Sequence, residues 1–243
     1  MHSKDEVATL AWCDNGLVEG RFADGLLTTL MSQNIHGVKF VNKIRVNGNQ
    51  IGRQRQTLFD KWADDIKTDW LLWVDSDIIL HPGILKILWD SADKLSKPVV
   101  TGLYYVSKQN EQSLMEPFPA IFKETGSDYS LQIIHPVPEN QLIKVDSAGF
   151  GLCLMHKSII EPMRKIDPGY SLFGEREEVG DKYISEDIVF FRKLKKAGFP
   201  LYAHTGAHAQ HMKTFSFDIN YNNLYWNGLQ KGLFRKEVNA TQQ

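Results

Sequence analysis

Residues 69–80 read DWLLWVDSDIIL, and this stretch decides the fold of the 243-residue chain. The five apolar residues Trp70 to Val74 are long enough for a strand buried on both faces, as in the middle of an α/β sheet. The run stops at Asp75, and Asp77 follows after one small residue, Ser76. Open α/β folds bind their ligands beyond the carboxyl ends of the strands. The stretch therefore predicts a ligand site at these two carboxylates.

Two carboxylates this close repel each other, and burying them near a core is costly unless a cation offsets their charge. A hard divalent ion such as Mg²⁺ or Mn²⁺, itself carrying phosphate oxygens, would provide that charge. The alternative is a solvated turn between the strand and the next helix, because Asp and Ser are common turn residues. The motif alone leaves both interpretations open.

The bulk composition is that of an ordinary soluble protein, with 42% apolar and 23% charged residues and a formal net charge of -1. This balance gives no global basic field and does not favour a dedicated nucleic-acid binder. Cys13 and Cys153 lie in apolar surroundings without metal-type spacing, so we expect reduced core residues. No apolar run reaches the ~18 residues of a membrane span, and the N-terminus lacks a signal-peptide pattern, so a cytoplasmic protein is expected.

Strand and helix patterns alternate over the first ~105 residues, which is typical of a mostly parallel α/β sheet. We expect strands at 7–12, 38–46, 70–74 and 98–105, and helices at 22–32 and 51–66. A further helix should follow Pro82 and Gly83. Its buried face is expected to contain Ile84, Ile87, Leu88, Ser91 and Leu95.

The second half of the chain is less regular. Four prolines between residues 107 and 139 indicate hairpins and a loop over the site. Strand character returns at 144–155 around Gly149 to Gly151, a short helix is expected at 157–166, and residues 169–182 are expected to form a mobile loop. Ser185 can cap a helix that runs to Ala197 and stops at Gly198, before a last strand at 199–203.

Two further groups of side chains could carry chemistry. Glu186 and Asp187 begin the helix after the predicted mobile loop, where acidic residues are also favoured by the helix dipole alone. His204, His208 and His211 follow the last predicted strand, at a spacing that does not form one helical face. No Cys or carboxylate stands at zinc spacing from them, so one histidine joining the two aspartates is more economical than a closed structural site.

Basic residues near the predicted strand ends could hold a diphosphate. Arg53 and Arg55 lie at the start of the helix before the aspartate strand, and Arg45 ends the preceding strand. Guanidinium groups bind phosphate oxygens in pairs. The alternative is a solvated helix face.

In chain order these features resemble a known family. They are Ala11-Trp12, Arg53-Gln54-Arg55, Trp73 to Asp77, Gly102 to Tyr105, Ala148 to Gly151, Ser185-Glu186-Asp187 and a late histidine. The set resembles GT-A-fold glycosyltransferases of the viral and bacterial type and the yeast Golgi mannosyltransferase family, over about residues 6–213. The resemblance implies an α/β fold of GT-A (Rossmann-like) type, with a mostly parallel central sheet flanked by helices and a smaller antiparallel sheet on the acceptor side.

The resemblance also implies roles for single residues. Asp75 and Asp77 would hold Mn²⁺ or Mg²⁺ and, through it, the diphosphate of a nucleotide sugar. His211 matches the family's late metal ligand best, with His208 as the alternative, although three histidines crowd a region where the family has one. Asp187 would deprotonate the acceptor, with Glu186 as the alternative. The expected donor contacts are Ala11, Trp12, Arg53, Asp75, Ser76, Asp77 and Tyr104.

The implied protein is one glycosyltransferase domain that transfers a hexosyl or pentosyl group to an acceptor hydroxyl, with inversion favoured by the Glu-Asp pair. Residues 6–105 would bind the nucleotide sugar, with UDP favoured over GDP, and residues 106–213 would bind the acceptor and carry catalysis. Residues 214–243 would form a tail. A glycan, a protein side chain or a modified nucleobase would all suit as acceptor.

Three other classes compete with this interpretation. A metal-dependent phosphatase of the Asp-x-Asp type would carry its motif near the N-terminus and follow it with Thr or Val, whereas Ile78 follows here. A nucleotidyltransferase would need an early Gly-rich loop bearing Arg or Lys, for which residues 14–17 are a poor substitute. A non-catalytic module that binds a nucleotide sugar or a glycan would use many of the same residues but would not need the carboxylate of Asp187.

Overall fold

A computed structural model describes residues 5–109, 115–125, 130–166, 168–169, 171–174, 184–213 and 219–232. The chain divides into two compact units. The larger unit spans residues 1–106 and 118–212 and contains the sheet and the candidate site. The smaller unit spans residues 107–117 and 213–243.

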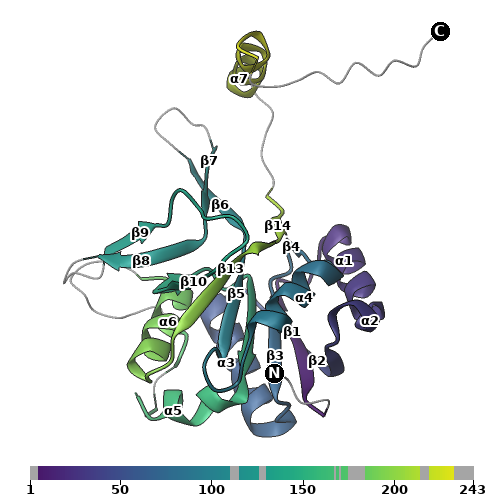
Figure 1. Ribbon diagram of the computed structural model, residues 1–243, viewed down its shortest axis with the longest axis vertical. Coiled ribbons are helices and arrows are strands. Elements are labelled where there is room, and N and C mark those ends of the chain that lie inside the picture. The colour runs from purple at the N-terminus through teal and green to yellow at the C-terminus, as the bar shows by residue number, and fades with distance from the viewer. Residues whose placement is uncertain are drawn as a thin grey trace. The chain divides into compact units, whose positions relative to one another are not determined.

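A seven-stranded sheet forms the centre of the larger unit, in the order β10-β13-β5-β12-β3-β1-β2 (Figure 1). The strands are β1 (Val7–Asp14), β2 (Lys39–Asn47), β3 (Trp70–Val74), β5 (Val99–Leu103), β10 (Leu142–Val145), β12 (Leu152–His156) and β13 (Leu201–His208). Strand β1 runs parallel to β2 and β3, and β13 runs parallel to β5. Only β12 and β10 run against their neighbours, so the sheet is mostly parallel.

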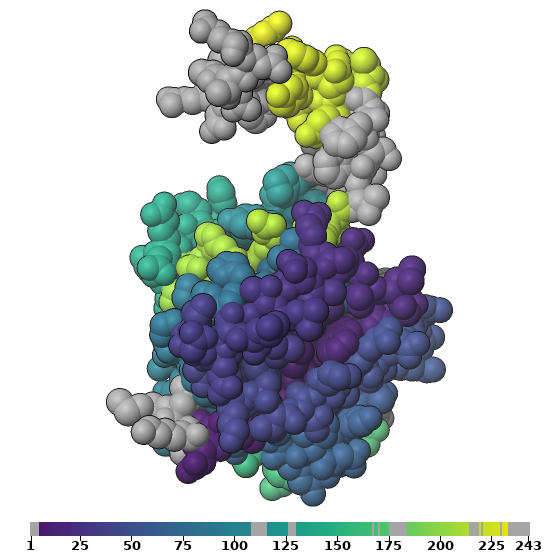
Figure 2. Space-filling view, turned by 90° about the vertical axis from the view of Figure 1, so that its right-hand side faces the viewer, coloured from purple at the N-terminus to yellow at the C-terminus, as the bar shows by residue number. Residues whose placement is uncertain are grey.

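Helices cover both faces of this sheet. Helices α1 (Gly20–Met31), α2 (Gln33–His36) and α4 (Pro82–Ser91) lie on one face. Residues of the first third of the chain, drawn purple to blue, make up much of the surface on that side (Figure 2). Helix α3 (Ile51–Asp60), which continues as a π-helical segment (Lys61–Ile66), lies on the other face with α5 (Ile160–Arg164) and α6 (Glu186–Lys196). Strand β3 is buried along its whole length, as its apolar run predicts.

Short strands complete the architecture. An antiparallel sheet of β11 (Ser147–Ala148), β8 (Ile121–Thr125) and β9 (Ser130–Ile133) stands beside the main sheet (Figure 1). Two small ladders join β4 (Ile78–Ile79) to β14 (Gln210–His211) and β6 (Tyr105–Gln109) to β7 (Met115–Pro119). The predicted fold class is therefore confirmed: a mostly parallel central sheet between helices, with a smaller antiparallel sheet.

Several local predictions need correction. Helix α4 buries Ile84, Leu85, Leu88 and Trp89, whereas Leu95 lies beyond its end and is 85% exposed. The predicted strand at 144–155 is three separate strands, because β10 and β12 belong to the main sheet, β11 pairs with β8 in the smaller one, and residues 149–151 form no strand. The predicted last strand extends further than expected, to His208. Most of the predicted mobile loop at 169–182 lies outside the described residues.

The smaller unit contains helix α7 (Ile219–Gln230), whose sequence has no Asp, Glu, Lys, Arg or His and which exposes Ile219, Leu224 and Trp226. Across the described parts of both units, no helix has the length and apolar character needed to cross a membrane.

Candidate functional site

A cavity of about 510 Å³ opens where the parallel strands β1, β2 and β3 end. It is lined by Cys13, Asp14, Asn15, Gly48, Asn49, Ile51, Gln54, Asp75, Ser76 and Asp77. Each of these residues belongs to a strand's carboxyl end, to the loop after it, or to the first turn of α3. The site is thus where the topology of a parallel sheet predicts it.

The Asp75–Asp77 segment forms a tight turn after β3. The Asp75 N–H donates to the Gly151 carbonyl at 2.8 Å, and the Ile78 N–H donates back to the Asp75 carbonyl at 3.0 Å. The Met212 N–H donates to the Asp77 carbonyl at 2.8 Å. Both aspartates therefore sit on a backbone held by partners distant in sequence, and their side chains are partly exposed, 24% for Asp75 and 36% for Asp77.

His211 lies beside Asp77 because β14 pairs with β4 directly after the turn, His211 opposite Ile78. Its Nε2 is 3.0 Å from Asp77 Oδ2, and its Nδ1 is 2.8 Å from the Tyr105 carbonyl oxygen. The Tyr104 ring meets the imidazole edge-on at 5.2 Å between centroids. The imidazole is 8% exposed and is fixed on three sides.

This arrangement fits a cation between His211 and Asp77. A carbonyl oxygen can only accept a hydrogen bond, so Nδ1 carries a proton and donates to Tyr105. In a neutral imidazole Nε2 then presents a lone pair to the Asp77 carboxylate, which also presents lone pairs. Only a proton on Nε2 or a cation makes that contact favourable, and metal-binding histidines commonly donate their other N–H to a carbonyl.

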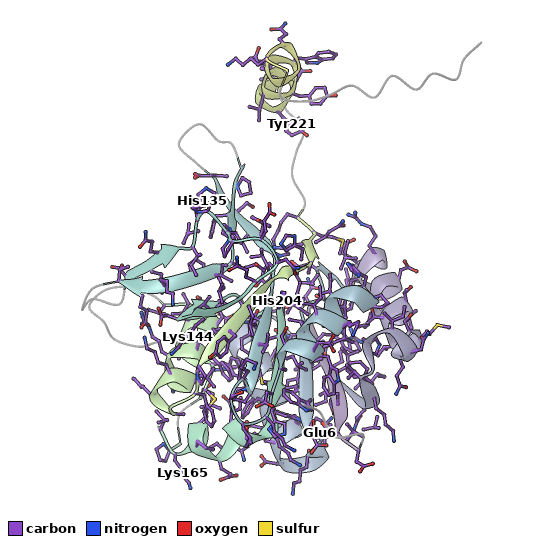
Figure 3. The ribbon with its side chains drawn as sticks, viewed as in Figure 1. Glu6, His135, Lys144, Lys165, His204 and Tyr221 are labelled. Carbon is purple, nitrogen blue, oxygen red and sulfur yellow. The ribbon has the colours of Figure 1, made fainter. Side chains whose placement is uncertain are left out.

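Two side chains do not complete a metal site. Within the residues that the structure describes, no group of three or more His, Cys, Asp or Glu side chains could hold a metal ion. The other predicted histidines do not join Asp77. His204 lies within β13 (Figure 3), and its Nδ1 accepts from the Gly206 N–H at 3.1 Å. His208 is exposed at the end of the same strand.

Asp75 is engaged by a buried arginine instead. The Nη2 of Arg55 lies 2.9 Å from Asp75 Oδ2 and 3.2 Å from Oδ1, and its Nη1 lies 2.7 Å from Glu186 Oε1. The Arg55 side chain is 5% exposed and stacks on the Phe150 ring, with Cζ 5.0 Å from the centroid. Burial alone would lower the pKa of Arg55. The nearby Asp75 and Glu186 carboxylates raise it by more than that, so the pKa lies above its ordinary value.

The first turn of α6 brings the Glu-Asp pair to this cluster. Burial raises the pKa of Glu186 above its ordinary value, and Arg55 offsets part of that shift. Asp187 Oδ1 accepts from the Ile188 N–H at 2.8 Å and from the Ser185 hydroxyl. Ser185 therefore orients Asp187 rather than capping the helix through its side chain, although α6 begins and ends where predicted.

The opposite side of the cavity contains a second ordered carboxylate. Asp14 accepts from Arg45 Nε at 2.6 Å and Nη2 at 2.8 Å, from Trp12 Nε1 at 3.0 Å and from the Gly16 N–H at 2.8 Å. The hydrogen bond from Arg45 holds the pKa of Asp14 below its ordinary value. Gln54 Nε2 donates to the Asp14 carbonyl at 2.8 Å. These bonds fix the backbone where β1 ends.

The structure separates the predicted donor contacts into two sets. Asp75, Ser76 and Asp77 line the cavity. Among the described residues its lining does not include Ala11, which is fully buried in the core, or Trp12, which packs toward Phe22.

The last two predicted donor contacts are also placed elsewhere. Arg53 is exposed on α3. Tyr104 is buried, and its hydroxyl accepts from the Gly151 N–H at 3.0 Å. Tyr104 therefore supports the glycine segment behind the site.

The sequence analysis offered Arg55 only as a possible diphosphate ligand, and the expected donor contacts did not include Asp14 or Gln54. For Arg55 a signal exists, because it shares the apolar stripe of α3 with Leu58 and Phe59, while Arg53 lies off that stripe. Cys13 also lines the cavity, but burial raises the pKa of its thiol to about 12. It is not a thiolate nucleophile at neutral pH.

Comparison with known proteins supports the fold. No protein-family model and no curated protein matches the sequence. Among solved structures, A197 from STIV aligns with a TM-score of 0.50 at 19% identity, over 86% of this chain and 87% of that one. GalNAc-T7, solved with UDP, GalNAc and Mn²⁺, aligns with a TM-score of 0.56 at 8% identity, over 86% of this chain and 44% of that one.

At these identities the likeness establishes architecture. The chain has a GT-A-like fold. The cavity, the Asp75–Asp77 turn and the α6 N-terminus all lie in the larger unit, which contains the seven-stranded sheet.

Proposed function

We propose that the protein is a metal-dependent glycosyltransferase that moves a sugar from a nucleoside-diphosphate sugar to an acceptor hydroxyl. The observation that carries this proposal is the Asp77–His211 pair, which presents an acid oxygen and an imidazole nitrogen to each other at 3.0 Å beside the cavity. A solvated turn would not require a buried imidazole held by a carbonyl on its far side.

The donor set suits a divalent cation of the Mn²⁺ or Mg²⁺ type. Carboxylate and imidazole are ligands that Mn²⁺ accepts, and such ions keep open positions for phosphate oxygens and water. Asp77 and His211 would hold the ion, and the diphosphate would complete its shell. When bound, the cation supplies a Lewis acid that offsets charge on the departing diphosphate.

The chain's own residues would then divide the work. Residues 6–105 would form the donor half, since the whole cavity lining falls within residues 13–77. Residues 106–213 would form the catalytic half, which contributes Glu186, Asp187 and His211. UDP is the first nucleotide to test, because the GalNAc-T7 structure that shares this fold contains it.

Asp187 would act as the base for the acceptor. Its Oδ1 is occupied by Ser185 and by the Ile188 N–H, so Oδ2 would take the hydroxyl proton. The acceptor oxygen would form its bond to the anomeric carbon while the bond from that carbon to the diphosphate breaks, and the diphosphate would leave with the electron pair. Attack on the opposite face would invert the anomeric centre. Glu186 is the poorer candidate because Arg55 already binds its carboxylate.

Calorimetry of nucleotide binding tests this proposal. UDP and GDP are titrated with and without Mn²⁺ into the wild type and into Asp77→Ala, which removes one of the two metal ligands. Asp90→Ala is the matched control, because Asp90 is an exposed carboxylate on α4 that pairs with Lys86. We expect one nucleotide to bind in a Mn²⁺-dependent manner to the wild type and to Asp90→Ala, and at least ~10-fold more weakly to Asp77→Ala.

Two outcomes would contradict the proposal. Binding of neither nucleotide with Mn²⁺ would remove the donor site. Equal Mn²⁺-linked nucleotide binding to Asp77→Ala and Asp90→Ala would show that Asp77 does not bind the metal and that the aspartate motif is only a turn.

A further inference from the structure

We propose that Arg55 is a positioning residue that ties Asp75 to Glu186 and thereby keeps Asp75 out of the metal's coordination shell. The proposal rests on the function inferred above and assigns the two carboxylates of the aspartate motif different tasks: Asp77 faces the cation, and Asp75 faces a fixed guanidinium.

The contacts join two segments that are far apart in the sequence. Asp75 follows β3, and Glu186 begins α6. One guanidinium reaches both, with Nη2 on the two Asp75 oxygens and Nη1 on Glu186 Oε1. Because the guanidinium is planar and its donors are fixed, the bridge sets both the separation and the orientation of the two carboxylates.

The arginine itself cannot adjust easily. Phe150 packs against the guanidinium face, and Arg55 Nε is buried without a hydrogen-bond partner. The helix that carries it is also anchored, because Gln56 Oε1 accepts from the Leu172 N–H at 2.7 Å and from the Ser171 hydroxyl at 2.9 Å. At Gly52 the backbone of α3 lies so close to Phe173 that a Cβ would be 2.6 Å from its carbonyl oxygen.

A purely stabilising role explains this arrangement poorly. Removing charges from water costs about as much as a buried ion pair returns, so well-packed apolar side chains would hold α3 at least as well. The placement makes sense if the cluster needs a permanent positive charge. Arg55 feels the charges of Asp75, Glu186 and Asp187 together, and Asp77 lies two residues from the first of them.

A consequence follows for metal binding. With Arg55 in place, both Asp75 oxygens accept from its Nη2, which holds the carboxylate toward the arginine. Among the described residues, Asp77 and His211 are then the side chains offered to the cation. Without Arg55, Asp75 gains the freedom to become a third protein ligand, and the site becomes more negative by one charge. The protein should then bind Mn²⁺ alone more tightly, while losing the alignment of Glu186.

The test is a calorimetric titration of Mn²⁺ alone into the wild type and Arg55→Met. Arg164→Met is the matched control, since Arg164 also bridges two carboxylates, Asp60 and Asp64, but on the outer surface. We expect the Mn²⁺ Kd to fall at least fivefold in Arg55→Met and to stay within twofold of the wild type in Arg164→Met. Adding Asp75→Asn to Arg55→Met should abolish the gain.

Two further variants keep the test decisive if Arg55→Met folds poorly. Asp75→Asn in the wild-type background should weaken Mn²⁺ binding by less than threefold, because Asp75 is not a ligand there. Arg55→Lys preserves the charge but reaches only one carboxylate. It should lower the kcat for Mn²⁺-dependent nucleotide release from a sugar nucleotide by about 10²-fold, with KM within threefold.

An unchanged or weaker Mn²⁺ affinity in Arg55→Met would overturn the proposal, as would a tenfold loss in Asp75→Asn. A wild-type kcat in Arg55→Lys would show that charge alone is needed and would overturn the positioning role. Failure of the proposed function looks different: the wild type would then bind no nucleotide with Mn²⁺, whatever Arg55→Met does to Mn²⁺ alone.

Discussion

Helix α3 packs closely against residues 171–174 at Gly52, and this contact allows a quantitative test of the structure. In Gly52→Ala the new Cβ would lie 2.6 Å from the Phe173 carbonyl oxygen and 3.6 Å from Glu186 Cβ. The first contact is with backbone, so it cannot be relieved by a rotamer change, and α3 or residues 171–174 must move. Overpacking of this kind costs about 1–3 kcal/mol.

Alanine also favours the helix over glycine by up to about 1 kcal/mol, which offsets part of that cost. The net expectation is a loss of about 1–2 kcal/mol in the free energy of unfolding, which combines the overpacking cost with the helix-propensity gain. With an m-value near 3 kcal/mol/M, the midpoint in urea should fall by roughly 0.5 M. Gly20→Ala is the control, because Gly20 also begins a helix but has no atom within 4 Å of its new Cβ. Gly20→Ala should be neutral or stabilising.

Urea unfolding followed by tryptophan fluorescence and by far-UV circular dichroism measures both variants. If Gly52→Ala proves as stable as Gly20→Ala, then α3 does not approach Phe173 as described. The anchored position of Arg55, three residues further along the helix, would lose its support as well.

Two other variants test the site. Asp187→Asn should lower kcat for nucleotide release by at least ~100-fold and leave Mn²⁺-linked nucleotide affinity within about threefold. Steady-state kinetics and calorimetry measure both quantities, with Asp90→Asn as the control; an unchanged kcat would show that Asp187 is not the base, and Mn²⁺-linked binding without any turnover in the wild type would indicate a binding module. Asp14→Asn tests how the Asp14–Arg45 ion pair makes stability depend on pH. Arg45 lowers the pKa of Asp14 in the folded state. The ion pair therefore stabilises the fold above the unfolded-state pKa of about 3.9, and this stabilisation is lost as the pH falls through the folded-state pKa. The stability difference between wild type and Asp14→Asn should therefore be constant near neutral pH and shrink below about pH 4 in urea melts; a difference that grows on acidification would contradict the ion pair.

The fold of residues 6–105 could be predicted from the sequence because the pattern that specifies it is local. The run of five apolar residues in β3 stops at Asp75, and the helix before β3 has a regular apolar stripe along one side. Parallel strands place their carboxyl ends at one edge, so the position of the cavity follows from the strand assignments alone.

The direction of β12 could not be predicted in the same way. Leu152–His156 is buried along its whole length and resembles a parallel central strand, yet it runs antiparallel between β3 and β5. A strand buried on both faces carries no alternation, and nothing in its composition records direction. The direction of β12 depends on the route that the chain takes through the elements between β5, which ends at Leu103, and β12, which begins at Leu152.

Arg53 and Arg55 show how a residue's phase on its helix matters more than its type. Both are arginines near the start of α3, and residue type alone assigns both to a phosphate. The apolar stripe turns Arg55 inward, to Asp75 and Glu186, and leaves Arg53 exposed. Burying a charged residue is costly unless it pairs with an opposite charge. An arginine on the buried face of a helix therefore predicts that buried acidic residues lie next to it.

The pairing register of β14 against β4 determines which histidine lies beside Asp77. The sequence pattern does not reveal this register. Side chains alternate along a strand, so a one-residue slip of β14 against β4 would turn His211 away and present Gln210 or Met212 instead. A ladder of two residues is too short to fix itself. Hydrogen bonds on both sides hold it: the Ala209 N–H donates to the Leu103 carbonyl at 2.9 Å, and the Met212 N–H donates to the Asp77 carbonyl at 2.8 Å. The second of these bonds arises from the aspartate turn itself, so the turn that carries one member of the pair also sets the register that delivers the other.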